Sequence, residues 1–296
     1  MHIEAKYHPN TSTLTYIVWD DETRDAVIID PVLDYDPVGS ETNTLSVRDV
    51  LAFVERNALE VHAILETHAH ADHITGAQAL KKALGAPVVI GEHIRAVQET
   101  FKPVFGFDDT FDTDGSQFDR LVADGEILEA GRLKVEVLHT PGHTPACVSY
   151  RIDDAVFTGD ALFMPDQGTG RCDFPKGNAK DLYAAVTNKL YTLPNATRVF
   201  VGHDYQPGGR ALAFETTIGA SKASNIQLRA DTSESEFVEF RQTRDGSLAP
   251  PRLLFQSVAL NIGAGRLPQP DAAGIRRMAL PLNLFQTSDD TGEPKV

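Results

Sequence analysis

Three imidazoles and a carboxylate are packed into six positions of the run Thr67-His68-Ala69-His70-Ala71-Asp72-His73. Nitrogen and oxygen ligands of this kind suit Zn, Fe, Co or Mn, whereas sets rich in thiolates favour other metals. The run directly follows an apolar segment, residues 61–66. Alternate side chains of an extended chain point to the same side, so His68 and His70 can converge on one point. We therefore predict a metal site at this junction between a strand and the next helix.

Three later segments also place polar residues at the end of an apolar strand. His143 lies in a tight loop fixed by two prolines and a glycine, Pro141-Gly142-His143-Thr144-Pro145, which would hold its imidazole rigidly. Asp160 follows a strand and a glycine that lets the backbone come close. His203 follows the apolar residues 199–201, and Tyr205 comes two residues later. Each segment is a weak signal alone, but together with the first run they predict one shared site.

Hydrophobic periodicity predicts an α/β protein. The expected strands cover residues 14–19, 26–30, 61–66, 87–90, 133–138, 147–152, 155–157 and 198–201. The expected helices cover residues 45–57, 74–84, 181–190, 210–228 and 234–243. Strands in groups separated by helices indicate sheets whose faces are covered by helices. Residues 99–120 fit neither period, and a loop of that length inside a compact domain is usually functional or structurally special.

Composition and charge narrow the class of protein. Hydrophobic residues make up 42% of the 296 residues, as in ordinary globular proteins. The formal net charge of −15 argues against a nucleic-acid or anionic-membrane partner. No apolar run is long enough to span a membrane, and residues 1–6 do not resemble a signal peptide. Two cysteines, Cys147 and Cys172, favour a reducing compartment, so we expect a cytoplasmic protein.

The order of the motifs, Thr-His-x-His-x-Asp-His, Pro-Gly-His-Thr, Thr-Gly-Asp and Gly-His-Asp, resembles the ligand signature of the metallo-β-lactamase superfamily. The resemblance covers residues 10–225 and implies that family's fold, an αββα sandwich, here with a C-terminal extension. The division that we expect is a catalytic domain over residues 1–228, an extension packed on it over residues 229–286, and a disordered tail over residues 287–296.

The segment after Asp160 resembles that of the persulfide dioxygenases (sulfur dioxygenases), in particular the longer bacterial type. It contains Gly170-Arg171-Cys172-Asp173-Phe174, which is similar to the Gly-Arg-x-Asp-Phe element of those enzymes. Glyoxalase II enzymes carry an aromatic and Glu-containing segment there instead. The triplet His203-Asp204-Tyr205 is also similar to the dioxygenase pattern. One departure is that this family has a cysteine near the start of the loop, where this chain reads Met164-Pro165-Asp166-Gln167.

The resemblance to dioxygenases implies one Fe(II) per chain, held by His68, His143 and Asp160. Two histidines and one carboxylate leave three metal positions open, enough for a substrate sulfur and O2 together. The remaining candidates would support these ligands from behind or form a second metal site; they are His70, Asp72, His73 and His203.

A dinuclear zinc thioester hydrolase of the glyoxalase II (hydroxyacylglutathione hydrolase) type is the alternative. One Zn²⁺ would then be bound by His68, His70 and His143, and the other by Asp72, His73 and His203, with Asp160 as the bridge. Both ligand sets are complete in the sequence, so counting ligands does not separate the two enzymes. The loop that contains Arg171 favours the dioxygenase.

The expected reaction converts glutathione persulfide, O2 and water into sulfite and glutathione, with Arg171 and Tyr205 as catalytic residues. Arg171 would contact a substrate carboxylate or pair with Asp173, and Tyr205 would donate a hydrogen bond in the site or pack in the core. Cys172 would be a persulfide relay or a passive side chain. A non-catalytic persulfide sensor is a third interpretation. The sequence leaves the carrier thiol and the oligomeric state open, and the resemblance is compatible with a homodimer.

Overall fold

The first sheet brings the histidine-rich run to one of its edges. The computed structural model describes residues 1–284, and in them this sheet has the order β1-β2-β3-β6-β8-β9. Its strands are β1 (His2–His8), β2 (Thr13–Trp19), β3 (Asp25–Ile29), β6 (Glu60–Glu66), β8 (Val88–Gly91) and β9 (Arg120–Val122). β3, β6, β8 and β9 are parallel, and sites in such sheets form beyond the carboxyl ends of the strands. The run that begins at Thr67 starts where β6 ends.

The second sheet brings two of the later motifs together. Its order is β10 (Ile127–Ala130), β11 (Leu133–His139), β12 (Val148–Ile152), β13 (Ala155–Phe157), β14 (Arg198–Phe200) and β15 (Glu215–Thr217). Because β13 and β14 are parallel neighbours, Asp160 and His203 leave the sheet at the same edge. Gly159 has a φ of +48°, and a Cβ there would lie 2.6 Å from Oγ1 of Thr67. Glycine is therefore required where Asp160 approaches the first sheet.

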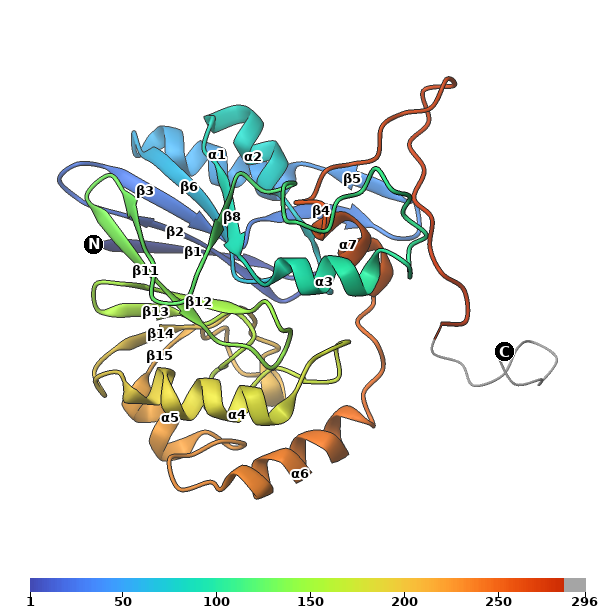
Figure 1. Ribbon diagram of the computed structural model, residues 1–296. Coiled ribbons are helices and arrows are strands. Elements are labelled where there is room, and N and C mark those ends of the chain that lie inside the picture. The colour runs from blue at the N-terminus through green and yellow to red at the C-terminus, as the bar shows by residue number, and fades with distance from the viewer. Residues whose placement is uncertain (285–296) are drawn as a thin grey trace, which may run out of the picture.

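Helices cover the outer face of each sheet (Figure 1). The helices on the first sheet are α1 (Leu45–Arg56), α2 (Ala77–Leu84), α3 (Ile94–Phe101) and α7 (Leu254–Asn261). On the second sheet lie α4 (Ala179–Asn188) and α5 (Ile218–Ser224), and α6 (Glu234–Asp245) packs on the outside of α4. Short 3₁₀ turns, η1 (Leu190–Thr192) and η2 (Pro207–Gly209), complete the connections. The four layers confirm the predicted αββα sandwich.

Strand alternation builds two buried layers of side chains. Tyr16 and Val18 face the second sheet, whereas Ile17 between them faces the helices of the first. Tyr16 packs edge-on against Phe157 and Phe200, with ring centroids 5.1 and 5.5 Å apart, and its hydroxyl donates to the carbonyl of Val201 at 2.6 Å. Removal of this apolar surface from water is the main stabilising contribution, and it holds the two motif-bearing edges together.

Two local predictions were wrong. Ile74 and Thr75 form a short strand, β7, which pairs with β4 (Val32–Asp36) in a small sheet that also contains β5 (Glu41–Asn43), so α2 starts only at Ala77. The helix expected over 210–228 is reduced to α5, because the chain before it pairs with β14 as β15. The long loop expected over residues 99–120 is confirmed in large part, because the chain leaves α3 at Phe101 and then runs without helix or strand as far as β9.

Buried side chains hold the segment that follows α3 in place. The side chain of Gln98 is fully buried, accepts a hydrogen bond from the backbone N–H of Gly115 at 3.0 Å, and donates to the side chain of Gln117 at 2.7 Å. Phe105 and Phe118 are buried in the core on the helix side of the first sheet. These contacts fasten the segment to α3 and to the core of the first sheet.

The last part of the chain contributes two helices and an extended arm. Phe237 of α6 is buried beside Tyr183 of α4, and Val258 of α7 is buried against the helices of the first sheet. After Gly265 the chain leaves the body as an arm (red in Figure 1), on which Ile275 and Leu282 are exposed. The tail expected over residues 287–296 lies outside the described residues.

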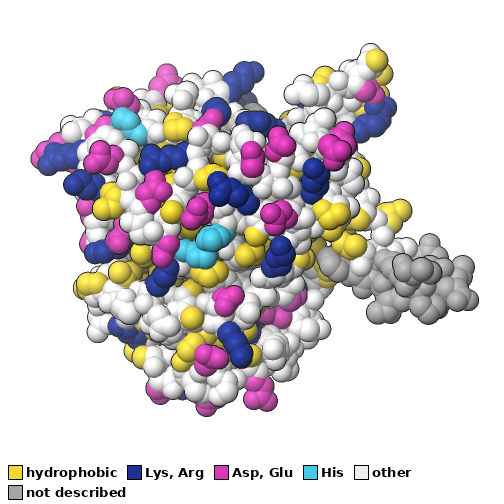
Figure 2. Space-filling model, viewed as in Figure 1, with side chains coloured by type: hydrophobic (Ala, Val, Ile, Leu, Met, Phe, Trp, Pro, Cys, Tyr) yellow, Lys and Arg dark blue, Asp and Glu magenta, His cyan; other side chains and the backbone are white. Residues whose placement is uncertain are grey.

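The surface carries mixed charge. Basic and acidic side chains are interspersed over the face seen in Figure 2. Within residues 1–284, none of the helices has the length and apolar character needed to cross a membrane.

Candidate metal centre

His68, His143 and Asp160 meet at the edge shared by the two sheets. Each offers a ligand atom within 4.8 Å of those of the other two, and all three side chains are buried. Nε2 of His143 lies 3.6 Å from Oδ2 of Asp160, and the rings of His68 and His143 are 4.9 Å apart. The structure thus brings together the three residues predicted to hold iron. Two imidazoles and one carboxylate form the donor set of a mononuclear site with open positions.

In His143 and His68, Nδ1 makes a hydrogen bond within the protein, which leaves Nε2 free to bind a metal. Nδ1 of His143 lies 2.7 Å from the carbonyl oxygen of Arg171, which can only accept, so Nδ1 carries the proton. Nδ1 of His68 lies 3.0 Å from Oγ1 of Thr67, whose own proton goes to Asp30 at 2.8 Å. His68 therefore donates from Nδ1, and its buried Nε2 has no hydrogen-bond partner among the described residues. A buried imidazole nitrogen without a partner fits a metal ligand.

Electrostatics favour the protonation states that a metal needs. Burial, reinforced by the neighbouring His70, holds the pKa of His68 well below its ordinary value, so the ring is neutral. Burial alone would raise the pKa of Asp160, but the charges of His203 and His143 outweigh it and lower the pKa. Neutral imidazole and ionised carboxylate are the ligating forms, so His68 and Asp160 are in the states that bind a cation near neutral pH.

A second group lies beside the first. His70, Asp72 and His203 also offer ligand atoms within 4.8 Å of one another. Nε2 of His203 lies 3.3 Å from Oδ1 of Asp160 and 3.7 Å from Oδ2 of Asp72, so this imidazole stands between the two groups. Burial lowers the pKa of His203, but Asp72 and Asp160 outweigh it and raise the pKa to about 9. His73 belongs to neither group; its Nδ1 lies 3.0 Å from Oδ2 of Asp72.

Two buried carboxylates that the sequence reading did not identify lie beside His70, and neither ring nitrogen of His70 has a hydrogen-bond partner among residues 1–284. Its Nε2 lies 3.0 Å from Asp30 and 3.4 Å from Glu66. Burial lowers the pKa of His70, but these carboxylates outweigh it and raise the pKa well above the ordinary value. Asp30 also accepts from the backbone N–H of Thr67 at 2.7 Å, and Thr75 donates to Glu66. The pair of acids thus fixes the start of the histidine-rich run.

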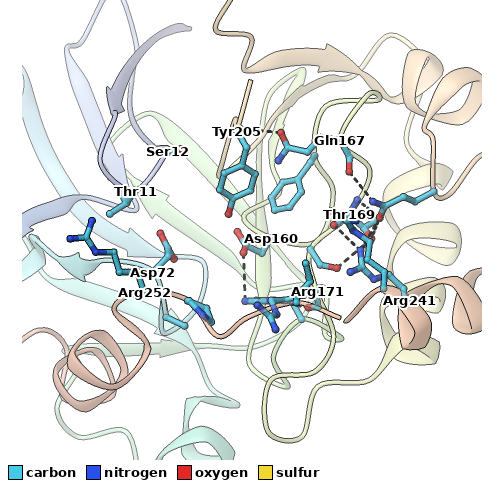
Figure 3. A pocket seen from close by; sticks show the side chains of 18 of the residues that line it. Thr11, Ser12, Asp72, Asp160, Gln167, Thr169, Arg171, Tyr205, Arg241 and Arg252 are labelled. Atoms are coloured by element: carbon cyan, nitrogen blue, oxygen red, sulfur yellow. Dashed lines mark hydrogen bonds and ion pairs between the residues drawn. The ribbon is translucent and has the colours of Figure 1, made fainter. Parts of the chain in front are cut away.

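A cavity of about 410 Å³ opens above Asp160. Tyr205 stands in its wall, with its ring parallel to that of His203 (centroids 5.7 Å apart, 10° between planes) and its hydroxyl directed toward Asp160 (Figure 3). The ring of Phe163 meets Tyr205 edge-on at 6.4 Å. With 55% of its surface exposed, Tyr205 reaches the cavity and does not pack in the core.

Arg171 lines the same cavity and is held in its own loop. Its Nε and Nη2 atoms each donate to the carboxylate of Asp173 at 2.6 Å. Its third contact is a hydrogen bond from Nη1 to the carbonyl oxygen of Ala249 at 2.8 Å. The pairing with Asp173, one of the two roles considered from the sequence, is therefore present. The other contact joins the loop to the C-terminal extension.

The two cysteines are buried. Burial raises the pKa of Cys172 to about 12 and that of Cys147 to about 12. Thiol chemistry requires the thiolate, so neither side chain is primed for a relay. The geometry favours the passive role for Cys172.

The C-terminal extension supplies two supports that the sequence reading missed. The side-chain amide of Asn261, in α7, donates to the carbonyl oxygens of His70 at 2.8 Å and His73 at 2.7 Å. Arg241, in α6, pairs with Asp245 and donates to the carbonyl of Thr169 at 3.2 Å. The only sequence signal for Asn261 is a polar residue that ends the apolar run of residues 258–260, and helices commonly end that way.

Comparison with known proteins agrees with the geometry. The model of the Metallo-beta-lactamase superfamily matches residues 9–203. Glyoxylase B2 of Dictyostelium discoideum is 44% identical over 286 residues, which cover 96% of this chain and 98% of that protein. The mitochondrial persulfide dioxygenase ETHE1 of Homo sapiens is 36% identical over 206 residues, which cover 69% of this chain and 68% of that protein.

A solved structure extends this likeness over most of the chain. The crystal structure of ETHE1 from Myxococcus xanthus has a TM-score of 0.72 and 34% identity, and the match covers 90% of this chain and 100% of that one. The fold, the metal-site geometry and these matches agree with the resemblance read from the motifs, and this chain belongs to the metallo-beta-lactamase superfamily.

Proposed function

We propose that this protein is a persulfide dioxygenase with one Fe(II) per chain. It converts a thiol persulfide, O2 and water into the thiol, sulfite and two protons (RSSH + O2 + H2O → RSH + SO3²⁻ + 2H⁺). Glutathione persulfide is the proposed substrate. The observation that carries this proposal is the group of His68, His143 and Asp160 at the cavity, joined directly to the Arg171 loop by the His143–Arg171 hydrogen bond.

The residues of the chain have separable tasks in this reaction. His68, His143 and Asp160 would hold the ferrous ion, which when bound supplies the electrons that activate O2 beside the persulfide. The hydroxyl of Tyr205 is directed toward Asp160, so it donates a hydrogen bond to a persulfide sulfur that approaches the ligand group. A tyrosine hydroxyl is protonated near neutral pH and can fill this role.

Residues behind the ligands orient them. Thr67 and the carbonyl of Arg171 set the ring tautomers of His68 and His143, as described above. His70 is not one of these ligands, and Asp30 and Glu66 lie beside its ring. Outer contacts of this kind fix ring orientation and raise the basicity of metal ligands.

The similarity to two proteins named ETHE1 supports this proposal, since the human protein is named a persulfide dioxygenase. The second candidate is a dinuclear zinc thioester hydrolase. It is favoured by the group of His70, Asp72 and His203, which is spaced to accept another ion, and by the similarity to Glyoxylase B2. The third, a persulfide sensor, would bind iron without turnover.

One experiment separates the three. The protein is purified anaerobically, its metals are quantified, and O2 uptake and sulfite release are followed with glutathione persulfide. In parallel, hydrolysis of a glutathione thioester is measured. We expect iron together with O2 uptake and sulfite release. Two zinc ions per chain with thioester cleavage would refute the proposal, and iron without turnover would indicate the sensor.

A further inference from the structure

Four arginines line the cavity above the candidate metal group, although the chain as a whole is strongly acidic. They are Arg171, Arg241, Arg244 and Arg252. In the view of Figure 3, Arg252 lies on the Asp72 side of the cavity, whereas Arg171 and Arg241 lie on the Thr169 side. The lining of the cavity thus holds four arginines and two acids, Asp72 and Asp160.

Two of the four are neutralised within the protein. Arg241 is 2% exposed and pairs with Asp245. Arg171 forms the double contact with Asp173 described above. These two guanidinium groups have their acids beside them, and their remaining contacts go to the carbonyl oxygens of neighbouring loops.

Arg244 and Arg252 are different. Both are exposed, and no side-chain hydrogen bond or ion pair engages either guanidinium among residues 1–284. Their backbone is nevertheless fixed, because Arg171 bonds to the carbonyl of Ala249 and Asp245 accepts from the backbone N–H of Cys172 at 2.8 Å. Arg244 and Arg252 thus place two unpaired guanidinium groups at the mouth of the cavity, on a segment whose backbone is held in place.

We propose that Arg244 and Arg252 bind the carboxylates of an acidic thiol carrier whose sulfur end reaches the group of His68, His143 and Asp160. This inference rests on the proposed function and makes it more specific. The planar guanidinium group matches a carboxylate with two parallel hydrogen bonds. Glutathione has a carboxylate at each end, with the thiol in the middle.

The size and lining of the cavity agree with this occupant. A volume of about 410 Å³ lies within the range of sites for small organic ligands. Leu248 and Pro251, which lie between the two arginines in the sequence, add apolar wall for the body of the ligand. A carrier with two acid groups should therefore bind better than a neutral one of the same size.

The test measures binding without turnover. The metal-loaded protein is titrated with S-methylglutathione, which keeps both carboxylates and lacks a reactive thiol, and with its diethyl ester, which keeps the amino group but lacks both carboxylate charges. We expect the acid to bind the wild type about tenfold more tightly than the ester, as for bidentate arginine recognition. We expect this margin to shrink with rising salt, because the attraction is electrostatic.

Substitutions test whether the two arginines cause the margin, which is the difference in affinity between the acid and the ester. Arg244→Gln and Arg252→Gln should each lower the tenfold margin to about threefold, and Arg252→Lys should keep more of it than Arg252→Gln because the charge remains. Arg48→Gln is the matched control, since Arg48 is an exposed residue of α1 that does not line the cavity. Equal binding of acid and ester by the wild type, or an unchanged margin in both glutamine variants, would overturn the inference.

The two proposals fail separately. A protein that oxidises glutathione persulfide, with no dependence on Arg244 or Arg252, keeps the proposed function and loses the carboxylate site. A protein that binds the acid through these arginines but takes up no O2 keeps the carboxylate site and loses the dioxygenase.

Discussion

The amide of Asn261 donates a 2.8 Å hydrogen bond to the carbonyl oxygen of His70, 191 residues earlier in the chain. A second bond goes to the carbonyl of His73, and the amide oxygen accepts from the backbone N–H of Thr75 at 3.0 Å. Asn261 is 3% exposed, so these bonds are protected from water. A residue of the C-terminal extension therefore fixes the backbone of the histidine-rich run.

Asn261→Ala should lower both stability and metal affinity. The change leaves two carbonyl oxygens and one N–H buried without partners, at about 1–3 kcal/mol for each group, so we expect a loss of roughly 3 kcal/mol in unfolding free energy. Urea unfolding of the metal-free protein measures it, and iron titration measures the affinity. Asn57→Ala is the control, because Asn57 makes a single side-chain bond at the end of α1. Equal losses of metal affinity in both variants would contradict the positioning role.

Arg241→Met should destabilise the protein strongly. Arg241 and Asp245 are both buried, so removal of the cation leaves an unpaired carboxylate in the interior. We expect a loss of about 3–5 kcal/mol in unfolding free energy, measured by urea unfolding. The double change Arg241→Met with Asp245→Leu should recover much of this loss, because no buried charge then remains. Arg229→Met, which breaks an exposed pair with Asp231, should have no measurable effect. A double variant no more stable than the single one would contradict the account.

Arg171→Gln should lower kcat/KM by about tenfold to a hundredfold with iron content unchanged. The side chain anchors Asp173 and Ala249, whereas the bond to His143 comes from the backbone carbonyl and survives the change. Steady-state O2 uptake gives kcat and KM. Asp173→Asn separates the two roles considered for Arg171: an equal loss indicates that the pair acts by shaping the loop, and a much smaller loss indicates direct contact with substrate. Full activity in Arg171→Gln would rule out both.

The cysteines should react very slowly with alkylating agents. With the pKa of Cys172 raised to about 12 by burial, its thiolate at pH 8 is roughly a thousandfold scarcer than that of an ordinary thiol. Mass spectrometry after treatment with iodoacetamide should find both cysteines unmodified in the folded protein and both modified in urea. Rapid labelling of Cys172 alone in the folded protein would contradict the passive role and support Cys172 as a persulfide relay.

Local sequence predicted most of what is local in this structure. The strands around the motifs and the helices α1, α4 and α6 are found within a few residues of their expected positions, because period and composition specify them. The helix predicted over residues 210–228 is wrong in its first part, because residues 215–217 pair with β14. Local sequence does not report such a contact with a distant strand. The strands β1, β4, β5, β9, β10 and β15 were missed, and most of them are short or at sheet edges.

The site divides in the same way. The sequence predicted the group of His68, His143 and Asp160, because each residue follows a strand within an ordered set of motifs. Asp30, Glu66 and Asn261 were not predicted, because each acts through a contact across the fold and lies in an unremarkable stretch of sequence. Arg244 and Arg252 were missed for another reason. Exposed arginines are common in sequences, and only their position in the wall of the cavity distinguishes these two from the others.

Iron content of two variants tests the central claim that one iron is bound by His68, His143 and Asp160. Wild type, Asp160→Ala and His70→Gln are purified anaerobically, reconstituted with ferrous iron, and analysed for metal per chain. We predict about one iron in the wild type, almost none in Asp160→Ala, and most of the wild-type amount in His70→Gln, whose side chain faces Asp30 and Glu66. Equal metal loss in the two variants, or two ions per wild-type chain, would contradict the account.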